Sequence, residues 1–476
     1  MTVYGGNEVG LGNPADHDVL SIRQNASFAG IFGIDRLEFM GPNAETEIRM
    51  TIGTDMVGAS KLSSTLSVQT KTNTNAVLAF NRAGSGPVNL DLSGWELNRL
   101  PGSKLKVEMN FTVGDMGQAD SIYGSPADDE ISTGAGDDTI VGSSGNDTMN
   151  GGAGNDSLFS AGIVRAGSAE IINGGEGTDF ASIVRWNQTQ AFDFDLTASG
   201  TQTLFDGTEI ISIESVRFQG GSGNDKLTGG ALADTLEGYF GSDTLNGGGG
   251  DDRLYEGGGI DSLIGGAGND TFLIRDAGDI IVEAAGQGTD TVLTILDFSL
   301  AALGAVENLK AEKAEDTTAL SLTGNALANT LAGNAGKNIL KGSSGNDLLE
   351  GLLGDDLLYG GTGEDVLAGG AGKDSFVFDS RLNKTTNVDT ILDFSAKDDT
   401  TRLENAIYKG LKKTGTVSKS AFVLGTKAKD ANDRILYNKK TSDVLYDADG
   451  SGRSAAVKIL KIAEKVALTH KDFFVI

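Results

Sequence analysis

The hydrophobic positions in the middle of the chain recur every nine residues. Between about residues 118 and 380, an aliphatic residue stands two positions after an acidic one, and this spacing returns in three runs. The aliphatic positions are Ile140, Met149 and Leu158, then Leu227, Leu236, Leu245, Leu254 and Leu263, then Leu349, Leu358 and Leu367. A disordered Gly/Ser/Asp linker would scatter its apolar residues, so the fixed phase predicts an ordered repeat.

The polar residues around these positions follow the pattern Gly-Gly-x-Gly-x-Asp-x-aliphatic-x, as in the segment 151–159. The first array contains Asp120, Asp129, Asp138, Asp147 and Asp156. The second array contains Asp225, Asp234, Asp243, Asp252, Asp261 and Asp270, and the third contains Asn329, Asn338, Asp347, Asp356, Asp365 and Asp374. Asp179 and Asp290 are isolated copies, each preceded by Gly-Thr.

The spacing predicts a stack of short coils. Glycines permit positive φ, so the Gly-rich half of each repeat can form a tight turn, and the other half a short strand with one side chain pointing inward. Two repeats then complete one coil, and coils stack about 4.8 Å apart. Carboxylates at the same edge of successive coils would repel one another unless a cation lay between them, and Ca²⁺ accepts several oxygen ligands in flexible geometry.

These segments resemble the repeats-in-toxin (RTX, hemolysin-type) calcium-binding repeats, over roughly residues 118–380. The resemblance implies ions held between stacked turns. One turn would supply the carbonyls of its second and fourth residues and its Asp, and the turn one coil further on the carbonyls of its first and third residues and its Asp. In this chain one such ion would be held by Gly134, Gly136, Asp138, Gly151, Ala153 and Asp156.

Some turns depart from the pattern, and we expect them to bind weakly or not at all. Asn329 and Asn338 are neutral, Leu232 replaces the fourth-position Gly, and Asp120 follows Asp-Met-Gly-Gln. Asp374 ends the third array, so we expect it to serve a single ion. The interior geometry of the arrays predicts roughly nine to eleven Ca²⁺ ions in all.

Two interruptions separate the arrays and resemble each other. Each contains one isolated Asp and later an aliphatic-Glu-x-aliphatic segment, at 213–216 and at 306–309. We interpret them as solenoid coils without calcium turns. Small inserted lobes are the alternative.

Residues 1–117 predict an all-β N-terminal domain of unknown role. The segments 48–52, 88–92 and 104–113 alternate between apolar and polar residues, as half-buried strands do. Either a degenerate solenoid or a sandwich is consistent with them.

Residues 381–476 resemble the C-terminal region that follows such repeats in proteins exported by bacterial type I secretion systems. The resemblance rests on segments 387–394, 434–437, 445–450 and 471–476, and it implies a cap for the solenoid and a secretion signal. The net charge of +6 here departs from the usual acidic tail. Asp447 and Asp449 favour a polar turn over a further calcium site, because the rest of an EF-hand loop is missing.

The composition of the chain limits the kinds of binding partner that we expect. The net charge of −28 disfavours nucleic acid and anionic membranes as partners and favours cations. There is no cysteine, no run of about 18 apolar residues that would predict a membrane-spanning helix, and no basic and apolar leader at the start of the sequence. We therefore expect export that does not read an N-terminal signal, to the exterior or cell surface of a Gram-negative bacterium.

Catalysis is not expected. The only histidines are His17 and His470, and no His-Glu-x-x-His motif exists, so the zinc protease that often precedes such repeats is absent. The sequence predicts an all-β protein, a calcium-bound parallel β-roll with an N-terminal β domain and a C-terminal cap, acting as a structural, surface or matrix component that could self-associate. An adhesin that binds a surface polysaccharide, and an enzyme using carboxylates within residues 1–117, are the alternatives.

Overall fold

The computed structural model describes residues 119–124, 128–160, 169–383 and 385–476, together with the backbone of seven strands before residue 119. The described residues form strands and three short 3₁₀ helices, η3 (Leu300–Ala302), η4 (Lys419–Ala421) and η5 (His470–Asp472), with no α-helix among them. None of these described helices is long and apolar enough to cross a membrane. The chain divides into two units, Met1–Asp252 with Gly257–Asp261, and Arg253–Glu256 with Ser262–Ile476.

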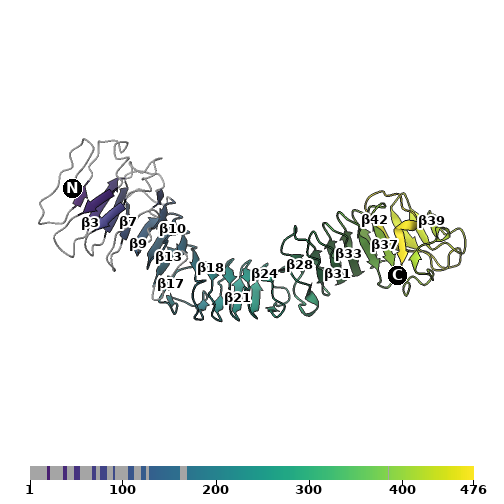
Figure 1. Ribbon diagram of the computed structural model, residues 1–476, viewed down its shortest axis with the longest axis horizontal. Coiled ribbons are helices and arrows are strands. Elements are labelled where there is room, and N and C mark those ends of the chain that lie inside the picture. The colour runs from purple at the N-terminus through teal and green to yellow at the C-terminus, as the bar shows by residue number, and fades with distance from the viewer. Residues whose placement is uncertain are drawn as a thin grey trace. The chain divides into compact units, whose positions relative to one another are not determined.

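The first unit is built from ladders of parallel strands, seen as successive rungs in Figure 1. One ladder contains β1 (Val19–Ser21), β3 (Ile48–Gly53), β5 (Ala76–Arg82), β7 (Leu105–Phe111), β9 (Asp129–Ala135), β11 (Thr148–Ala153), β13 (Ile171–Glu176) and β17 (Glu209–Ile211), with β16 (Gln202–Thr203) antiparallel at its end. A second contains β6 (Asn89–Asp91), β8 (Ser121–Tyr123), β10 (Thr139–Val141), β12 (Ser157–Ser160), β14 (Phe180–Val184), β18 (Ser215–Gln219) and β20 (Thr235–Glu237). Shorter ladders join β15 (Asp193–Asp195), β19 (Lys226–Thr228) and β21 (Thr244–Gly249), and pair β2 (Arg36–Phe39) with β4 (Ser67–Thr70).

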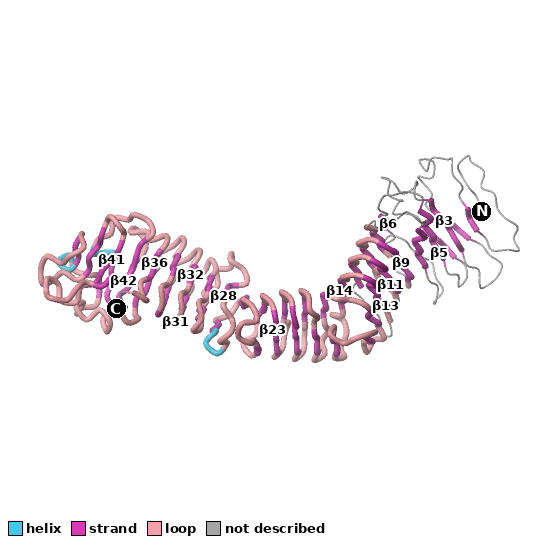
Figure 2. Tube along the Cα trace, turned by 180° about the vertical axis from the view of Figure 1, so that it is seen from behind, coloured by secondary structure: helices cyan, strands magenta, loops and turns pink. Residues whose placement is uncertain are grey.

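The second unit repeats this construction. One ladder contains β22 (Arg253–Tyr255), β24 (Thr271–Ile274), β26 (Thr291–Thr294), β28 (Asn308–Ala311), β30 (Thr330–Ala332), β32 (Leu348–Glu350), β34 (Val366–Ala368) and β36 (Asp389–Ile391). Another contains β27 (Phe298–Ser299), β29 (Ser321–Thr323), β31 (Ile339–Ser344), β33 (Leu357–Thr362), β35 (Ser375–Phe378), β37 (Thr400–Leu403) and β43 (Phe473–Val475), and β23 (Ser262–Ala267) pairs with β25 (Ile280–Val282). Figure 2 shows the turns that join successive strands at the edges of these ladders.

The last coils of the second unit are closed by antiparallel strands. β40 (Ile435–Asn438), β41 (Asp443–Tyr446) and β42 (Val457–Ile462) form an antiparallel sheet, and β42 pairs in parallel with β36. β39 (Phe422–Leu424) pairs in parallel with β40, and β38 (Gly415–Thr416) is antiparallel to β43. An open stack of coils needs such a covering of its last rung.

Within the arrays, each strand pairs with the strand one coil away, which is two repeats along the chain, as the sequence predicts. Ile140 lies opposite Leu158, and Met149 opposite Ile131, in parallel pairs. The aliphatic position two residues after each Asp is fully buried throughout the arrays. Each repeat therefore contributes one aliphatic side chain to a continuous interior, which confirms the predicted phase.

The interruptions are further coils of the solenoid. β14 pairs with β18 across the first interruption, and β26 pairs with β24 and β28 in the second. The inserted-lobe alternative is therefore wrong, because these segments continue the ladders in parallel register.

The seven strands before residue 119 also pair in parallel, and β7 pairs with β9 of the first array. The predicted strands at 48–52, 88–92 and 104–113 coincide with β3, β6 and β7. This parallel arrangement is that of a degenerate solenoid rather than an antiparallel sandwich.

The turns need left-handed backbone, and this explains their glycines. Gly152 and Gly154 have φ of 113° and 134°, and their Cα atoms face the carbonyls of Gly134 and Gly136 so closely that a Cβ would collide. Four turns carry another residue at the second position and still adopt positive φ, between 73° and 83°: Ser143, Tyr239, Ser343 and Leu352. The turn conformation is thus set by the stack, with Gly the residue that adopts it without strain.

Candidate metal sites at the coil turns

Aspartate carboxylates form columns along the edges of the stack. In each array, Oδ1 of one Asp accepts a hydrogen bond from the backbone N–H of the residue 18 positions earlier. The Asp138 N–H donates to Asp156 at 2.8 Å, and the Asp347 N–H donates to Asp365 at 2.9 Å. The repeat aspartates are buried, with exposures of 1–2%. They are Asp120, Asp129, Asp138, Asp147, Asp156, Asp179, Asp225, Asp234, Asp243, Asp252, Asp261, Asp270, Asp290, Asp347, Asp356, Asp365 and Asp374.

The second carboxylate oxygen is the feature that points to a ligand. In eight of these aspartates Oδ2 is buried and accepts no hydrogen bond: Asp147, Asp156, Asp179, Asp243, Asp347, Asp356, Asp365 and Asp374. A buried, ionised oxygen without a partner is strongly unfavourable. Such an oxygen, repeated at equivalent positions, indicates a site for a cation.

The pKa values of these carboxyls also show that burial disfavours their ionised form. Burial, together with the charge of Asp129, raises the pKa of Asp147 to about 9. Burial raises the pKa of Asp156 and Asp356 to about 7. A backbone hydrogen bond opposes this rise, and the charges of neighbouring aspartates add smaller increases. Without a cation these groups tend to hold a proton, and the ionised carboxylates need compensating positive charge to stay buried.

Backbone carbonyls of the turns line the same edge. The carbonyls of Gly134 and Gly136 point at the turn one coil further on. The carbonyl of Gly151 accepts from the Thr133 hydroxyl at 2.9 Å, and that of Ala153 accepts from the Gly136 N–H at 2.8 Å. The structure thus brings the turns of these four residues together, while their joint ligation of one ion stays a prediction.

The donor set fits Ca²⁺. Carboxylate and carbonyl oxygens converge at the turns, and these hard ligands suit calcium, whereas zinc prefers nitrogen and sulfur ligands. The chain has no cysteine. An ion between two turns would be bound by the aspartates of both coils and would bring two positive charges to them.

In the first two turns of the second array, the aspartate carboxylates accept hydrogen bonds from backbone N–H groups of their own turns. Oδ2 of Asp225 accepts the N–H of Gly221 at 2.9 Å, and Oδ2 of Asp234 accepts the N–H of Gly230 at 2.6 Å. These aspartates follow an interruption, so the coil before them belongs to that interruption rather than to an array. Hydrogen bonds within their own turns provide part of the stabilisation that an ion would give.

The two asparagines that begin the third array use their amides instead. Nδ2 of Asn338 donates to the carbonyls of Asn334 and Gly336 at 3.0 and 2.8 Å. Nδ2 of Asn329 donates to the carbonyl of Glu307 at 3.0 Å. In these turns the side-chain amide N–H groups donate to backbone carbonyls that a cation would otherwise contact. Neutral asparagines can therefore occupy the aspartate position.

Five acidic residues occupy the aspartate position of their coils but lie outside the nine-residue spacing: Glu170, Glu214, Glu307, Asp389 and Asp399. The Asp179 N–H donates to Glu214, and the Asp290 N–H donates to Glu307. These two glutamates are those of the aliphatic-Glu-x-aliphatic segments, so that shared motif was the signal. Asp389 accepts a hydrogen bond from the Asp365 N–H, and Asp399 accepts one from the Asp374 N–H. The column of acidic residues therefore continues past Asp374, although the nine-residue array ends there as predicted, and the single ion expected at Asp374 stays a prediction.

One acidic group departs from the two-carboxylate pattern. Carboxylate oxygens of Asp270, Glu283 and Asp290 all lie within 4.8 Å of one another. Glu283 also accepts the Gly265 N–H at 2.7 Å, and burial and Asp290 raise its pKa to about 7. No spacing in the sequence indicated Glu283, because its coil lacks the repeat.

Comparison with known families agrees with this geometry. The profile of the RTX calcium-binding nonapeptide repeat (4 copies) matches residues 118–158, 219–254, 229–263, 255–273, 323–358 and 350–380. These matches cover the three arrays and leave out the interruptions. No curated protein matches the chain. The arrays are therefore RTX repeats, and RTX repeats bind calcium.

Proposed function

We propose that this RTX repeat protein leaves the cell unfolded, folds when it binds calcium outside, and serves there as a structural component of a surface or matrix. The unpartnered, buried Oδ2 atoms of the arrays carry the proposal. They make folding depend on a cation supplied from solution at those turns.

The charge distribution supports this dependence. Because residues 381–476 carry +6 of the total charge of −28, residues 1–380 carry a net charge of −34, and this part of the chain repels itself unless cations bind. Roughly nine to eleven Ca²⁺ ions would offset most of that excess. Because binding requires the stacked form, it stabilises the folded state by mass action.

The difference in calcium concentration between the cytosol and the exterior would then determine where the chain folds. Extracellular calcium modules bind at about 10⁻⁴–10⁻³ M, far above cytosolic concentrations. The chain would stay extended inside the cell, in a form that a type I secretion apparatus can transport. Residues 381–476, which include the antiparallel cap, would contain the export signal.

Deletion of the last ~60 residues tests the export route. We expect the shortened chain to accumulate inside a Gram-negative host that secretes the full chain, because the signal is lost. Secretion of the shortened chain at the level of the full chain would contradict the C-terminal signal.

A light-scattering titration with Ca²⁺ tests the structural role. A rise in particle size at millimolar calcium is expected of a component that assembles. A monomer at all calcium concentrations that binds a polysaccharide would instead favour the adhesin. The sites that an adhesin or a carboxylate enzyme would need fall in residues 1–117, whose side chains lie outside the described residues.

A further inference from the structure

The aspartate column of the first array continues into the first interruption with other residues. β9, β11, β13 and β17 pair in parallel, with Ile131 opposite Met149, Met149 opposite Ile172, and Ile172 opposite Ile210. The residues two positions before these, which hold the aspartate position, are Asp129, Asp147, Glu170 and Thr208. Glu170 and Thr208 thus stand where two aspartates of a calcium turn would stand.

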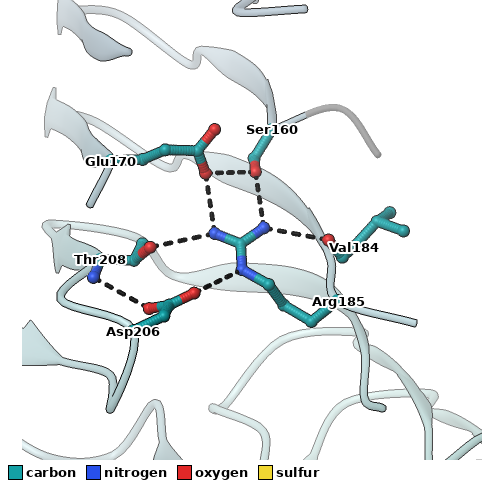
Figure 3. Close-up of polar contacts among 6 residues, drawn as sticks. All are labelled: Ser160, Glu170, Val184, Arg185, Asp206 and Thr208. Carbon is teal, nitrogen blue, oxygen red and sulfur yellow. Dashed lines mark hydrogen bonds and ion pairs between the residues drawn. The ribbon is translucent and has the colours of Figure 1, made fainter. Parts of the chain in front are cut away.

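The guanidinium of Arg185 lies between these two residues (Figure 3). Nη2 donates to Glu170 Oε2 at 2.7 Å and to Thr208 Oγ1 at 3.1 Å. Nη1 donates to the Ser160 hydroxyl at 2.9 Å and to the Val184 carbonyl at 3.0 Å, and Nε donates to Asp206 Oδ2 at 2.9 Å. All five N–H donors of the side chain are used.

The site is closed to solvent. The Arg185 side chain is 0% exposed, and those of Glu170 and Asp206 are 2% and 3% exposed. A buried arginine is costly to desolvate, and it is tolerated here because two carboxylates and three neutral oxygens surround it. Each acceptor of these hydrogen bonds is an oxygen of a type that calcium also accepts.

We infer that Arg185 is an internal substitute for a calcium ion, which closes the column of ions at this coil and conceals a latent calcium site. Its charge compensates the carboxylates of Glu170 and Asp206 from within the chain. The coil that contains it would therefore need no ion at this edge. The inference uses the calcium binding of the repeats and is independent of where the protein acts.

Replacement of the arginine tests the inference by gain of function. In Arg185→Ala, two buried carboxylates, two hydroxyls and a carbonyl lose their cation and gain space. We expect this variant to bind one Ca²⁺ ion more than the unaltered protein, counted by native mass spectrometry. Its loss of thermal stability should be large at low calcium and should shrink as calcium rises, because the ion binds only the folded form.

Two controls separate this result from ordinary effects of charge. Arg217→Ala removes an arginine paired with Glu237 in the same unit, but the Arg217 side chain is 50% exposed, so the ion count should not change. Arg185→Ala with Thr208→Asp restores an acidic pair at the aspartate positions, and the additional ion should bind more tightly than in Arg185→Ala alone.

An unchanged ion count in Arg185→Ala, or a loss of stability that is equal at all calcium concentrations, would overturn the inference. So would a variant that fails to fold even at about 10-fold the calcium that saturates the unaltered protein, since calcium is expected to rescue it. If the unaltered protein bound no calcium, the proposed function would fail first. The ion count of that protein and the difference between the two counts report on the two proposals separately.

Discussion

The coils of the first array and the coils of the first interruption neutralise one edge of the stack in different ways. At Asp129 and Asp147 two carboxylates lie close together, and the charge of Asp129 helps to raise the pKa of Asp147. One coil later, Glu170 and Thr208 enclose the Arg185 guanidinium. At this edge the interruption supplies positive charge from within the chain, and we propose that the array takes it from calcium in solution.

The second unit also has two kinds of turn, but there a neutral amide takes the place of the arginine. Asp356 and Asp374 have buried oxygens without hydrogen-bond partners. Asn338, one coil before Asp356, directs its amide at two turn carbonyls instead. We therefore expect dependence on calcium to be a property of individual turns that single substitutions can change.

The largest effect is expected from an interior aspartate. Asp365 accepts the N–H of Asp347 and donates its own to Asp389, so it would serve the ions on both sides. Asp365→Asn should lower the bound-ion count by up to two and shift the calcium midpoint of folding upward by about tenfold or more, a change of ~1.4 kcal/mol or more. Calorimetric titration measures both quantities.

Asp355→Asn is the matched control for that variant. Asp355 belongs to the same array, but it is 43% exposed and pairs with Lys337 on the surface. The same change of charge there should leave the ion count unaltered. Equal losses in the two variants would mean that general charge, rather than ligation at the turn, controls binding.

A smaller effect, of opposite sign, is expected at the asparagine. Asn338→Asp replaces an amide donor with a carboxylate that faces the carbonyls of Asn334 and Gly336. The variant should be less stable in chelator by about 1–3 kcal/mol, because these polar groups lose their hydrogen bonds. It should also bind one additional Ca²⁺ ion beside Asp356. Stability that is reduced equally with and without calcium would argue against a latent site at this turn.

The smallest effect is expected from pH. Burial raises the pKa of Asp156, Asp243 and Asp347 from 3.8 to about 7. Between these values the folded chain without calcium binds more protons than the unfolded chain, so its stability falls as pH rises from about 4 to 7. In chelator, circular dichroism should therefore show more β structure at pH 5 than at pH 7.5. In excess calcium the order should reverse, because protons compete with the ion for the carboxylates. The same order in both solutions would contradict this assignment of the carboxylates.

The arrays could be predicted from the sequence because their chemistry is periodic. One aliphatic residue and one Asp in every repeat define both the interior, as at Leu158, and the edge, as at Asp156. The interruptions could be predicted as further coils, but not the residues that meet at their edges, since the steps along their columns are 23, 35, 20 and 17 residues, unlike the constant step of the arrays. Arg185 meets Glu170 and Asp206 only because the intervening loops return to the same edge, and no local spacing encodes that return.

Hydrogen exchange during stepwise removal of calcium tests the central claim most directly. The account predicts that amides of β9, β11, β31 and β33, in the arrays, lose protection first as chelator is added. Amides of β13 and β17, beside Arg185, should lose protection last within the first unit, because the chain itself neutralises the edge that Glu170 and Thr208 line. Loss of protection around Arg185 at the same calcium concentration as in β9 and β11 would contradict the account.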